Sequence, residues 1–225
     1  MNPIIKKSYA KINLGLKIIN KRPDNFHNIK SIFIQISLHD TLQFISNNKF
    51  EIISEGIKTP TNHENIIYKT VSTLEKKFNI KIKHKIILDK KIPIGAGLGG
   101  GSSNAAVALK TLNSIYNLKL NKKQLIKISN SIGSDIPFFI DGGTKCIAGK
   151  GDIINKLNYA ALKNKKILLV FPNFNISTKW AYTAYKKYLV QSAVSAKFPN
   201  FNKPVNWQLF ENDFEKVRKS TYPEI

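Results

Sequence analysis

A glycine-rich stretch in the middle of the chain, from residue 90 to residue 104, constrains the fold more than any other feature. Five of the chain's 12 glycines lie within seven residues, between Gly95 and Gly101. The preceding segment is rich in isoleucine, as strands are, and an alanine-rich helical pattern follows. Glycines let backbone N–H groups turn toward a ligand, and the start of a helix favours phosphate. The stretch therefore predicts a nucleotide-phosphate loop between a strand and a helix.

This loop differs from two common phosphate-binding patterns. It lacks the Gly-Lys-Ser/Thr ending of the Walker A loop and does not match the spacing of the dinucleotide-binding fingerprint. A plain glycine-rich turn without a ligand is the alternative. Lys90 before the glycines and the serines Ser102 and Ser103 after them favour the phosphate loop over that alternative.

Length and composition are those of a globular protein. The chain has 225 residues, of which 42% are hydrophobic, and it can bury a sizeable core in one or two domains. No apolar run approaches the roughly 20 residues of a membrane span, and the N-terminus lacks the apolar core of a signal peptide. The single cysteine, Cys146, permits no internal disulfide and no thiolate metal cluster. We expect a cytoplasmic protein that does not enter the membrane and has no metal site built from its own side chains.

The net charge of +22 raises the alternative of a nucleic-acid-binding protein. Nearly all the basic residues are lysines, however, and Arg22 and Arg218 are the only arginines. The lysines are scattered among isoleucine and asparagine, without an arginine-rich helix or the aromatic signature of an RNA-binding sheet. We therefore expect a general attraction for anionic small molecules, and nucleic acid is not expected as the main partner.

Residues 4 to 19 alternate between apolar and polar side chains, which predicts a strand. Lys11 and Asn13 lie on the same face of this strand. Such a row is commonly a solvent-facing edge, and spacing alone leaves that alternative open beside a functional role.

Periodicity and end signals predict the remaining elements. Asn121 and Gln124 are placed like a capping box, and Gly133 is the expected stop of the same helix. Ser102 or Ser103 is expected to cap the helix after the glycine loop, and Ser177 a later one. Strands are expected at 31–38, 41–45, 50–53, 80–88 and 166–171, a hairpin around 149–151, helices at 64–78, 105–116, 121–132, 177–189 and 211–219, and a loop at 191–207.

Asp135 is the one acid in the apolar run from residue 134 to residue 139. It could cap a short helix, sit in a plain turn, or act in catalysis. Local sequence does not separate these roles.

Four stretches occur in an order and spacing that resemble the GHMP kinases. They are residues 10–14, the turn 22–27, the glycine loop and residues 133–138, and residues 212–215 and 222–225 add to the likeness. Among the branches of the family, the resemblance is to kinases that phosphorylate the 2-hydroxyl of 4-diphosphocytidyl-2-C-methyl-D-erythritol in the non-mevalonate isoprenoid pathway. It implies an α+β fold of two lobes. The first lobe (residues 1–158) is of the ribosomal protein S5 domain 2-like type, and residues 159–225 form the start of the second lobe.

The resemblance also implies roles for individual residues, with ATP and Mg²⁺ as cofactors. Asp135 would accept or orient the substrate hydroxyl, and Lys11 would stabilise the transferring phosphoryl group. Asn13 would contact the methylerythritol, His27 would hydrogen-bond the cytosine, and Phe26 or Tyr182 would stack on it. The nucleotide would contact Asn65, Lys90, Pro93, Ile94, Gly95, Ala96, Gly97, Leu98, Gly99, Gly100, Gly101, Ser102 and Ser103.

One departure from the family pattern concerns the C-terminal part. GHMP kinases carry a third glycine-rich motif near the C-terminus, and nothing after Phe171 resembles it. We therefore expect an incomplete second lobe, which leaves a homodimer open as a source of stability. The alternatives are another GHMP small-molecule kinase and a non-catalytic relative that binds nucleotide or nucleic acid.

Overall fold

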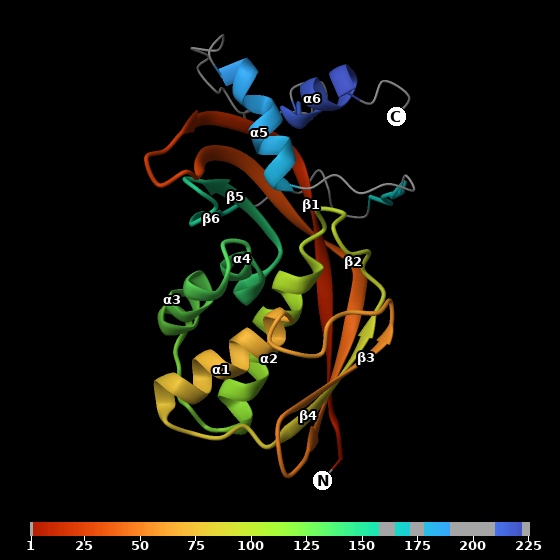
Figure 1. The fold of residues 1–225 in the computed structure, drawn as a ribbon, viewed down its shortest axis with the longest axis vertical. Coiled ribbons are helices and arrows are strands. Elements are labelled where there is room, and N and C mark those ends of the chain that lie inside the picture. Colours follow the sequence, from red (N-terminus) through yellow and green to blue (C-terminus); the bar gives the residue numbers. More distant parts are fainter. Residues whose placement is uncertain (1, 158–164, 172–177, 190–209, 222–225) are drawn as a thin grey trace. The chain divides into compact units, whose positions relative to one another are not determined.

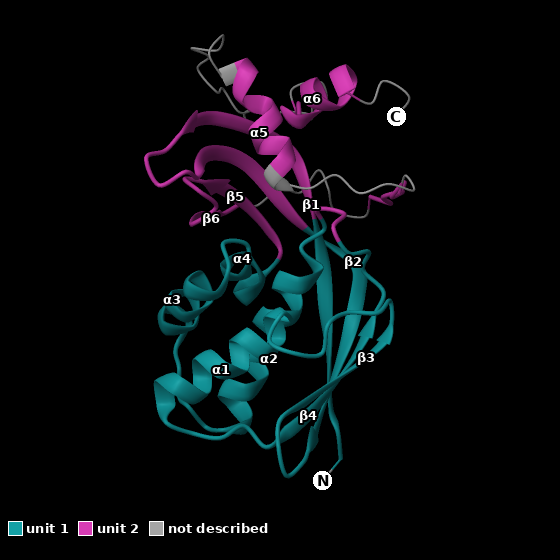
Figure 2. Ribbon diagram, in the orientation of Figure 1, with its two compact units in different colours: residues 1–11, 35–94, 98–142 teal, residues 12–34, 95–97, 143–225 magenta. Residues whose placement is uncertain are grey.

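The computed structural model describes residues 2–157, 165–171, 178–189 and 210–221. These residues form two compact units (Figure 2). The first comprises residues 1–11, 35–94 and 98–142, and the second comprises residues 12–34, 95–97 and 143–225. In chain order (Figure 1) the elements are β1 (Ile4–Lys21), β2 (His27–Ser46), β3 (Glu51–Gly56), α1 (Ile66–Phe78), β4 (His84–Lys90), α2 (Gly100–Ile115), α3 (Lys122–Ile132), α4 (Ile136–Asp141), β5 (Thr144–Ala148), β6 (Ile153–Lys156), α5 (Thr178–Leu189) and α6 (Phe214–Thr221).

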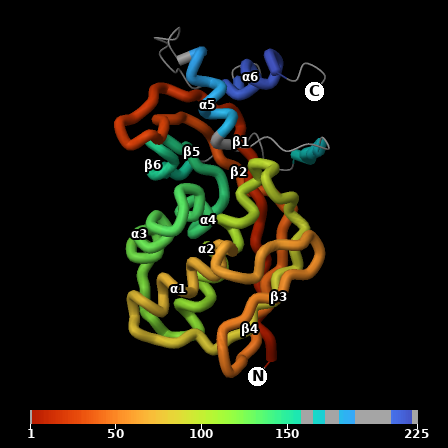
Figure 3. The backbone as a smooth tube through the Cα atoms, viewed as in Figure 1, coloured from red at the N-terminus to blue at the C-terminus, as the bar shows by residue number. Residues whose placement is uncertain are grey.

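Strands β1 and β2 are long, pair with each other and contribute residues to both units. Figure 3 follows the chain from β1 through the turn after Lys21 into β2. In the first unit, β2 pairs antiparallel with β4, from Thr41 opposite Asp89 to Ser46 opposite His84. Strand β4 in turn pairs in parallel with β3. The end of β4 therefore leads from the centre of this sheet into the glycine loop.

Helices α1 to α4 lie together on one side of the strands of the first unit (Figure 2). The core between these layers takes apolar residues at strand and helix spacing. Helix α2 contributes small residues such as Ala105 and Ala108, both fully buried, so it can approach the sheet closely. Other fully buried side chains are Leu42, Phe44, Ile67, Leu74, Ile86, Leu88 and Leu109.

The helix ends of the first unit match the sequence in one case and differ in another. The capping box of α3 is present, with Asn121 and Gln124 each bonding the other's backbone. The expected serine cap of α2 is wrong. Gly99, in the left-handed region at φ 66°, occupies the N-cap position without a side-chain cap, so both serines lie in the helix. A helix can begin earlier there because glycine adopts this conformation without strain.

In the second unit, β2 pairs antiparallel with β5 from Ser31 to Ile34, and β5 pairs antiparallel with β6. The hairpin expected around Gly149 to Gly151 is confirmed. Helices α5 and α6 pack against each other. The segment before α6 attaches to β1, because the Asp213 amide donates a 2.8 Å hydrogen bond to the Leu16 carbonyl and Leu16 forms a bridge with Asn212.

The strand expected at residues 166–171 is wrong. Residues 165–171 have no regular secondary structure, and Leu168 and Val170 are 88% and 81% exposed. An apolar run becomes a strand only where a neighbouring strand takes up its backbone hydrogen bonds, and no strand among the described residues pairs with it. Ser177, the loop 191–207 and residues 222–225 lie outside the described residues, as do residues 158–164, where the lobe boundary is expected.

Candidate active site

Lys11 and Asp135 both belong to the first unit, and the charge of Asp135 acts on the Lys11 ammonium. Lys11 lies on β1 and is 5% exposed, so it is not part of a solvent-facing row, in contrast to one of the two sequence interpretations. Burial lowers the pKa of Lys11 from its ordinary value of 10.5, and the negative charge of Asp135 opposes that shift. The cation is therefore buried within electrostatic reach of a half-buried carboxylate.

Asp135 immediately precedes α4 and occupies its N-cap position, yet its side chain makes no cap hydrogen bond. Its backbone is already helical, at φ −87° and ψ −14°, whereas a capping residue is usually extended. The helix-cap explanation of this aspartate is therefore not supported. The carboxylate is placed by the rigid, buried start of α4, where Ile136, Pro137 and Phe138 are all buried.

The glycine loop passes directly beside Lys11. The Lys11 amide donates a 2.9 Å hydrogen bond to the Leu98 carbonyl. A Cβ at Gly99 would lie 2.7 Å from Cζ of Phe139 and 3.2 Å from Cγ of Lys11. Only a residue without a side chain allows this approach, and the positive φ of Gly99 also favours glycine. The start of α2 is thereby held against the Lys11 side chain.

The start of α2 fits an anionic ligand. The helix has no side-chain cap on its first turn, so its leading N–H groups and dipole are available to a phosphate. At Gly100 a Cβ would lie 2.9 Å from Lys90 Nζ and from Ile92 Cγ2, which shows how tightly the chain packs beneath the loop. Ser102 is half-buried, and Ser103 is 2% exposed. Of the two serines, Ser102 is the more accessible to a ligand.

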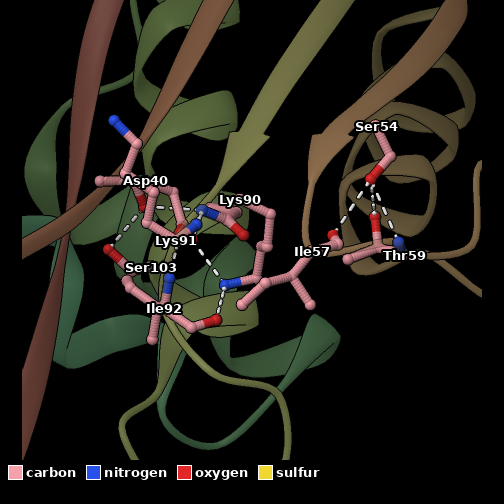
Figure 4. Close-up of polar contacts among 10 residues, drawn as sticks. Asp40, Ser54, Ile57, Thr59, Lys90, Lys91, Ile92 and Ser103 are labelled. Carbon is pink, nitrogen blue, oxygen red and sulfur yellow. Dashed lines mark hydrogen bonds and ion pairs between the residues drawn. The ribbon is translucent and has the colours of Figure 1, made fainter.

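The other two residues expected near the nucleotide are bonded within the protein. Asn65 is the N-cap of α1: its Oδ1 accepts from the Ile67 amide at 2.9 Å and its Nδ2 donates to the Pro60 carbonyl at 2.6 Å. Lys90 is 4% exposed and pairs with the fully buried Asp40 at 2.8 Å (Figure 4). Contact of either side chain with a nucleotide stays a prediction.

Sequence reasoning missed Asp40. It lies on β2, far along the chain from the glycine loop, and its four hydrogen-bond donors come from two later segments. The available signal was a single acid, residue 40, between two strand-like apolar runs, where an unpaired charge would be costly.

In the second unit the structure brings together two of the four residues expected to bind substrate. The rings of His27 and Tyr182 stack, with centroids 4.8 Å apart. Burial, and secondarily Lys21, lowers the pKa of His27, which favours the neutral ring that can both donate and accept a hydrogen bond. Phe26 is 51% exposed, and Lys150 Nζ lies 5.1 Å from the centre of its ring.

Asn13, the fourth of these residues, is half-buried on β1.

Among the described residues, no group of three His, Cys, Asp or Glu side chains could hold a metal ion. In the same part of the chain, no helix is long and apolar enough to cross a membrane.

The chain resembles known proteins along most of its length. A family model described as "GHMP kinases N terminal domain" matches residues 65–143. A 4-diphosphocytidyl-2-C-methyl-D-erythritol kinase of Thermodesulfovibrio yellowstonii is 40% identical over 97% of this chain and 79% of its own length. A protein of the same name from Prochlorococcus marinus (strain AS9601) is 45% identical over 80% of this chain and 58% of its own length.

A solved structure agrees with these relatives. The crystal structure of a 4-(cytidine 5'-diphospho)-2C-methyl-D-erythritol kinase matches with a TM-score of 0.72 and 25% identity, covering 98% of this chain and 79% of that one. The expected α+β fold of the GHMP kinases is thereby confirmed. On the strength of these matches, the chain belongs to the 4-diphosphocytidyl-2-C-methyl-D-erythritol kinases, a branch of the ATP-using GHMP kinase family.

Proposed function

We propose that this protein transfers the γ-phosphoryl group of ATP to the 2-hydroxyl of 4-diphosphocytidyl-2-C-methyl-D-erythritol. The observation that carries the proposal is the buried Lys11, which lies beside Gly99 at the uncapped start of α2 and interacts electrostatically with Asp135. The relatives' names supply the substrate. Phosphoryl transfer needs positioning and charge stabilisation more than covalent chemistry, and this arrangement offers both.

Within this proposal Asp135 accepts the proton of the attacking hydroxyl, or orients that hydroxyl toward the phosphorus. Lys11 stabilises the negative charge that develops on the transferring group. Its burial keeps water from screening that charge. Because Lys11 contacts the glycine loop through its own backbone, the cation and the loop are positioned together.

The glycine loop, from Pro93 to Ser103, would hold the phosphates of ATP, which supplies the phosphoryl group. The uncapped first turn of α2 and the close packing at Gly99 and Gly100 fit a phosphate. Mg²⁺ commonly binds through substrate phosphates and one or two protein oxygens instead of a full protein cage. We propose Ser102 as the accessible hydroxyl beside the phosphates.

The second unit would hold the substrate's cytidine. A neutral His27 can hydrogen-bond the cytosine, and the aromatic rings of Phe26 and Tyr182 offer flat surfaces for stacking. Asn13 would contact the methylerythritol part. A cytoplasmic location and a homodimer belong to the proposal as predictions from the sequence.

The test is ADP release with Mg²⁺ and ATP, using 4-diphosphocytidyl-2-C-methyl-D-erythritol as acceptor and homoserine and mevalonate as controls. The proposal predicts turnover with the cytidyl acceptor alone. Turnover with a control acceptor would instead identify another GHMP kinase. Binding to RNA that weakens steeply with salt, without turnover of any acceptor, would favour the nucleic-acid-binding alternative.

A further inference from the structure

A single buried carboxylate joins the two ends of the glycine loop. Asp40 is fully buried on β2. Its Oδ1 accepts hydrogen bonds from the amides of Lys91 and Ile92, each 2.8 Å long, just before the loop. Its Oδ2 accepts from Asn104 Nδ2 at 2.8 Å, just after the loop. All these residues belong to the first unit.

Lys90 compensates the buried charge. Its Nζ lies 2.8 Å from Oδ2 of Asp40 and also donates to the Ile92 carbonyl at 2.6 Å. The ammonium sits beneath the first residue of α2, since a Cβ on Gly100 would approach it to 2.9 Å. A cation so near a helix start opposes the helix dipole, and Asp40 neutralises it there.

The same carboxylate acts on the loop's last serine through a chain of hydrogen bonds. The Nδ2 group of Asn104 donates to Oδ2 of Asp40 and, at 2.9 Å, to Oγ of Ser8. The Ser8 hydroxyl then donates to Oγ of Ser103 at 2.8 Å. Asn104 can serve both acceptors because its amide nitrogen carries two hydrogens. Ser103 is therefore oriented by Asp40 through two intermediate side chains.

We propose that Asp40 is the positioning residue of the nucleotide loop, fixing the distance between its two ends and the orientation of Ser103. Lys90 then acts through Asp40 and not by touching the nucleotide. The inference rests on the proposed kinase function for the identity of the ligand. The contacts of Asp40 lie at both ends of one loop and not within one helix or strand. Loss of these contacts should therefore free the loop without unfolding the sheet.

The test is Asp40→Asn, with binding of Mg²⁺–ADP and Mg²⁺–ATP measured by calorimetry. The amide nitrogen would face the donors of Lys90 and Asn104 instead of accepting from them, while the amide oxygen can still accept from the backbone. Nucleotide Kd should rise about tenfold or more. At saturating ATP, kcat should stay within about threefold, because neither Lys11 nor Asp135 is altered.

Electrostatics alone predicts that Asp40→Asn lowers the nucleotide Kd, since removing a negative charge near an anion site should tighten binding. Asp89→Asn is the matched control. It removes the same charge from β4, where Asp89 pairs at 3.1 Å with the exposed Lys91 side chain, and nucleotide Kd should stay within about twofold. Equal or tighter nucleotide binding by Asp40→Asn would overturn the positioning role.

Asn104→Ala is the second variant, in case Asp40→Asn folds poorly. It leaves the Asp40–Lys90 pair intact and removes the two hydrogen bonds that Asn104 donates, to Asp40 and to Ser8, so nucleotide Kd should rise while the melting temperature changes little. Hydrogen exchange should quicken at the Lys91 and Ile92 amides in Asp40→Asn, because a neutral amide oxygen is a weaker acceptor than a carboxylate, and it should not change in α3. Wild-type binding in an Asn104→Ala protein that is folded would contradict the inference. Failure of the wild type itself to bind nucleotide would count against the proposed function instead.

Discussion

The rings of His27 and Tyr182 lie face to face, 4.8 Å between centroids and 14° between planes. A base inserted between two rings replaces one stacking contact by two and needs a wider gap than a directly stacked pair leaves, so cytosine cannot enter between them as they stand. Phe214 meets the Tyr182 ring in a T-shaped contact, with centroids 4.9 Å apart. A base that stacks on the Tyr182 face now covered by His27 must therefore first displace the imidazole ring.

This relationship predicts a substrate-specific effect of Tyr182→Leu. Loss of a stacking ring costs about 1–3 kcal/mol per base, so KM for the cytidyl substrate should rise about tenfold or more. KM for ATP should not change. Steady-state kinetics with each substrate varied in turn measures both values. Tyr188→Leu, the same change on the same helix, is the control, and an equal rise in that variant would show that α5 packing is responsible.

The absence of a cap bond at Asp135 predicts that its carboxylate matters for chemistry and little for folding. Asp135→Asn should lower kcat about 10²- to 10⁴-fold, the usual contribution of a general base. Stability should change little, because this side chain does not cap the start of α4. Nucleotide affinity should also change little, because the proposed phosphate site lies at the start of α2. Single-turnover rates and calorimetry measure the rate and the affinity. Near-full turnover by the variant would exclude Asp135 as the base.

Burial of Lys11 predicts the position of the alkaline limb of the pH–rate profile. The cation is the active form, and burial lowers its pKa below 10.5, so activity should fall as pH rises through that lowered value. Lys11→Arg should move the limb upward, since a guanidinium stays charged. A profile of kcat from pH 7 to the limit of protein stability tests this, and an unchanged limb in Lys11→Arg would assign it to another group.

The same shift has a consequence for folding. A lysine with a depressed pKa in the folded state destabilises the fold where it is charged in both states. Stability should therefore be regained as pH rises through the folded pKa toward 10.5. Lys11→Met should lack that component of the pH dependence, which urea unfolding at several pH values measures.

Local signals in the sequence were sufficient for several elements of the described fold. The alternation of residues 4 to 19, the capping box at Asn121 and the glycine loop each depend on neighbours in the chain, and each is confirmed in position. The order of these motifs also identified the family, because their combination is more specific than any one of them.

Long-range contacts account for what the sequence could not reveal. The surroundings of Lys11 come from distant segments, because the Leu98 carbonyl accepts a hydrogen bond from its amide and Asp135 acts on its charge. The role of Asp40 depends on donors from segments that follow much later. The apolar run at 166–171 has the composition of a strand, but composition does not say whether a partner strand is present, and its exposure reflects that difference.

Gly99 and Gly101 should respond differently to the same substitution. At Gly99 a methyl group would lie 2.7 Å from the Phe139 ring, on a backbone with φ 66°, so Gly99→Ala combines a clash with about 1–2 kcal/mol of backbone strain. At Gly101 the nearest atom is 3.6 Å away. Gly101→Ala should be neutral or stabilise α2 by up to about 1 kcal/mol. Urea unfolding of both variants tests the pair, and equal stability would show that the loop yields at Gly99.

The contacts of Asp213 predict that this residue contributes to holding the segment before α6 in the second unit. Its carboxylate is buried and accepts a 2.8 Å hydrogen bond from the Ile18 amide, and Lys17 Nζ lies 3.5 Å away. Burial, followed by the negative charge of Asp213 and a hydrogen bond with it, raises the pKa of the Tyr185 phenol, so the hydroxyl stays protonated and donates to Asp213.

Asp213→Ala should therefore cost about 3 kcal/mol, because it leaves a buried amide and a buried hydroxyl without their acceptor. Glu211→Ala is the control. It removes an exposed partner of the same lysine, and exposed pairs contribute about 1 kcal/mol or less. The free energies of unfolding of the two variants, measured with denaturant, should differ by about 2 kcal/mol. A loss no greater than that of Glu211→Ala would mean that water replaces the carboxylate and that this segment is held mainly by its backbone bonds to Leu16.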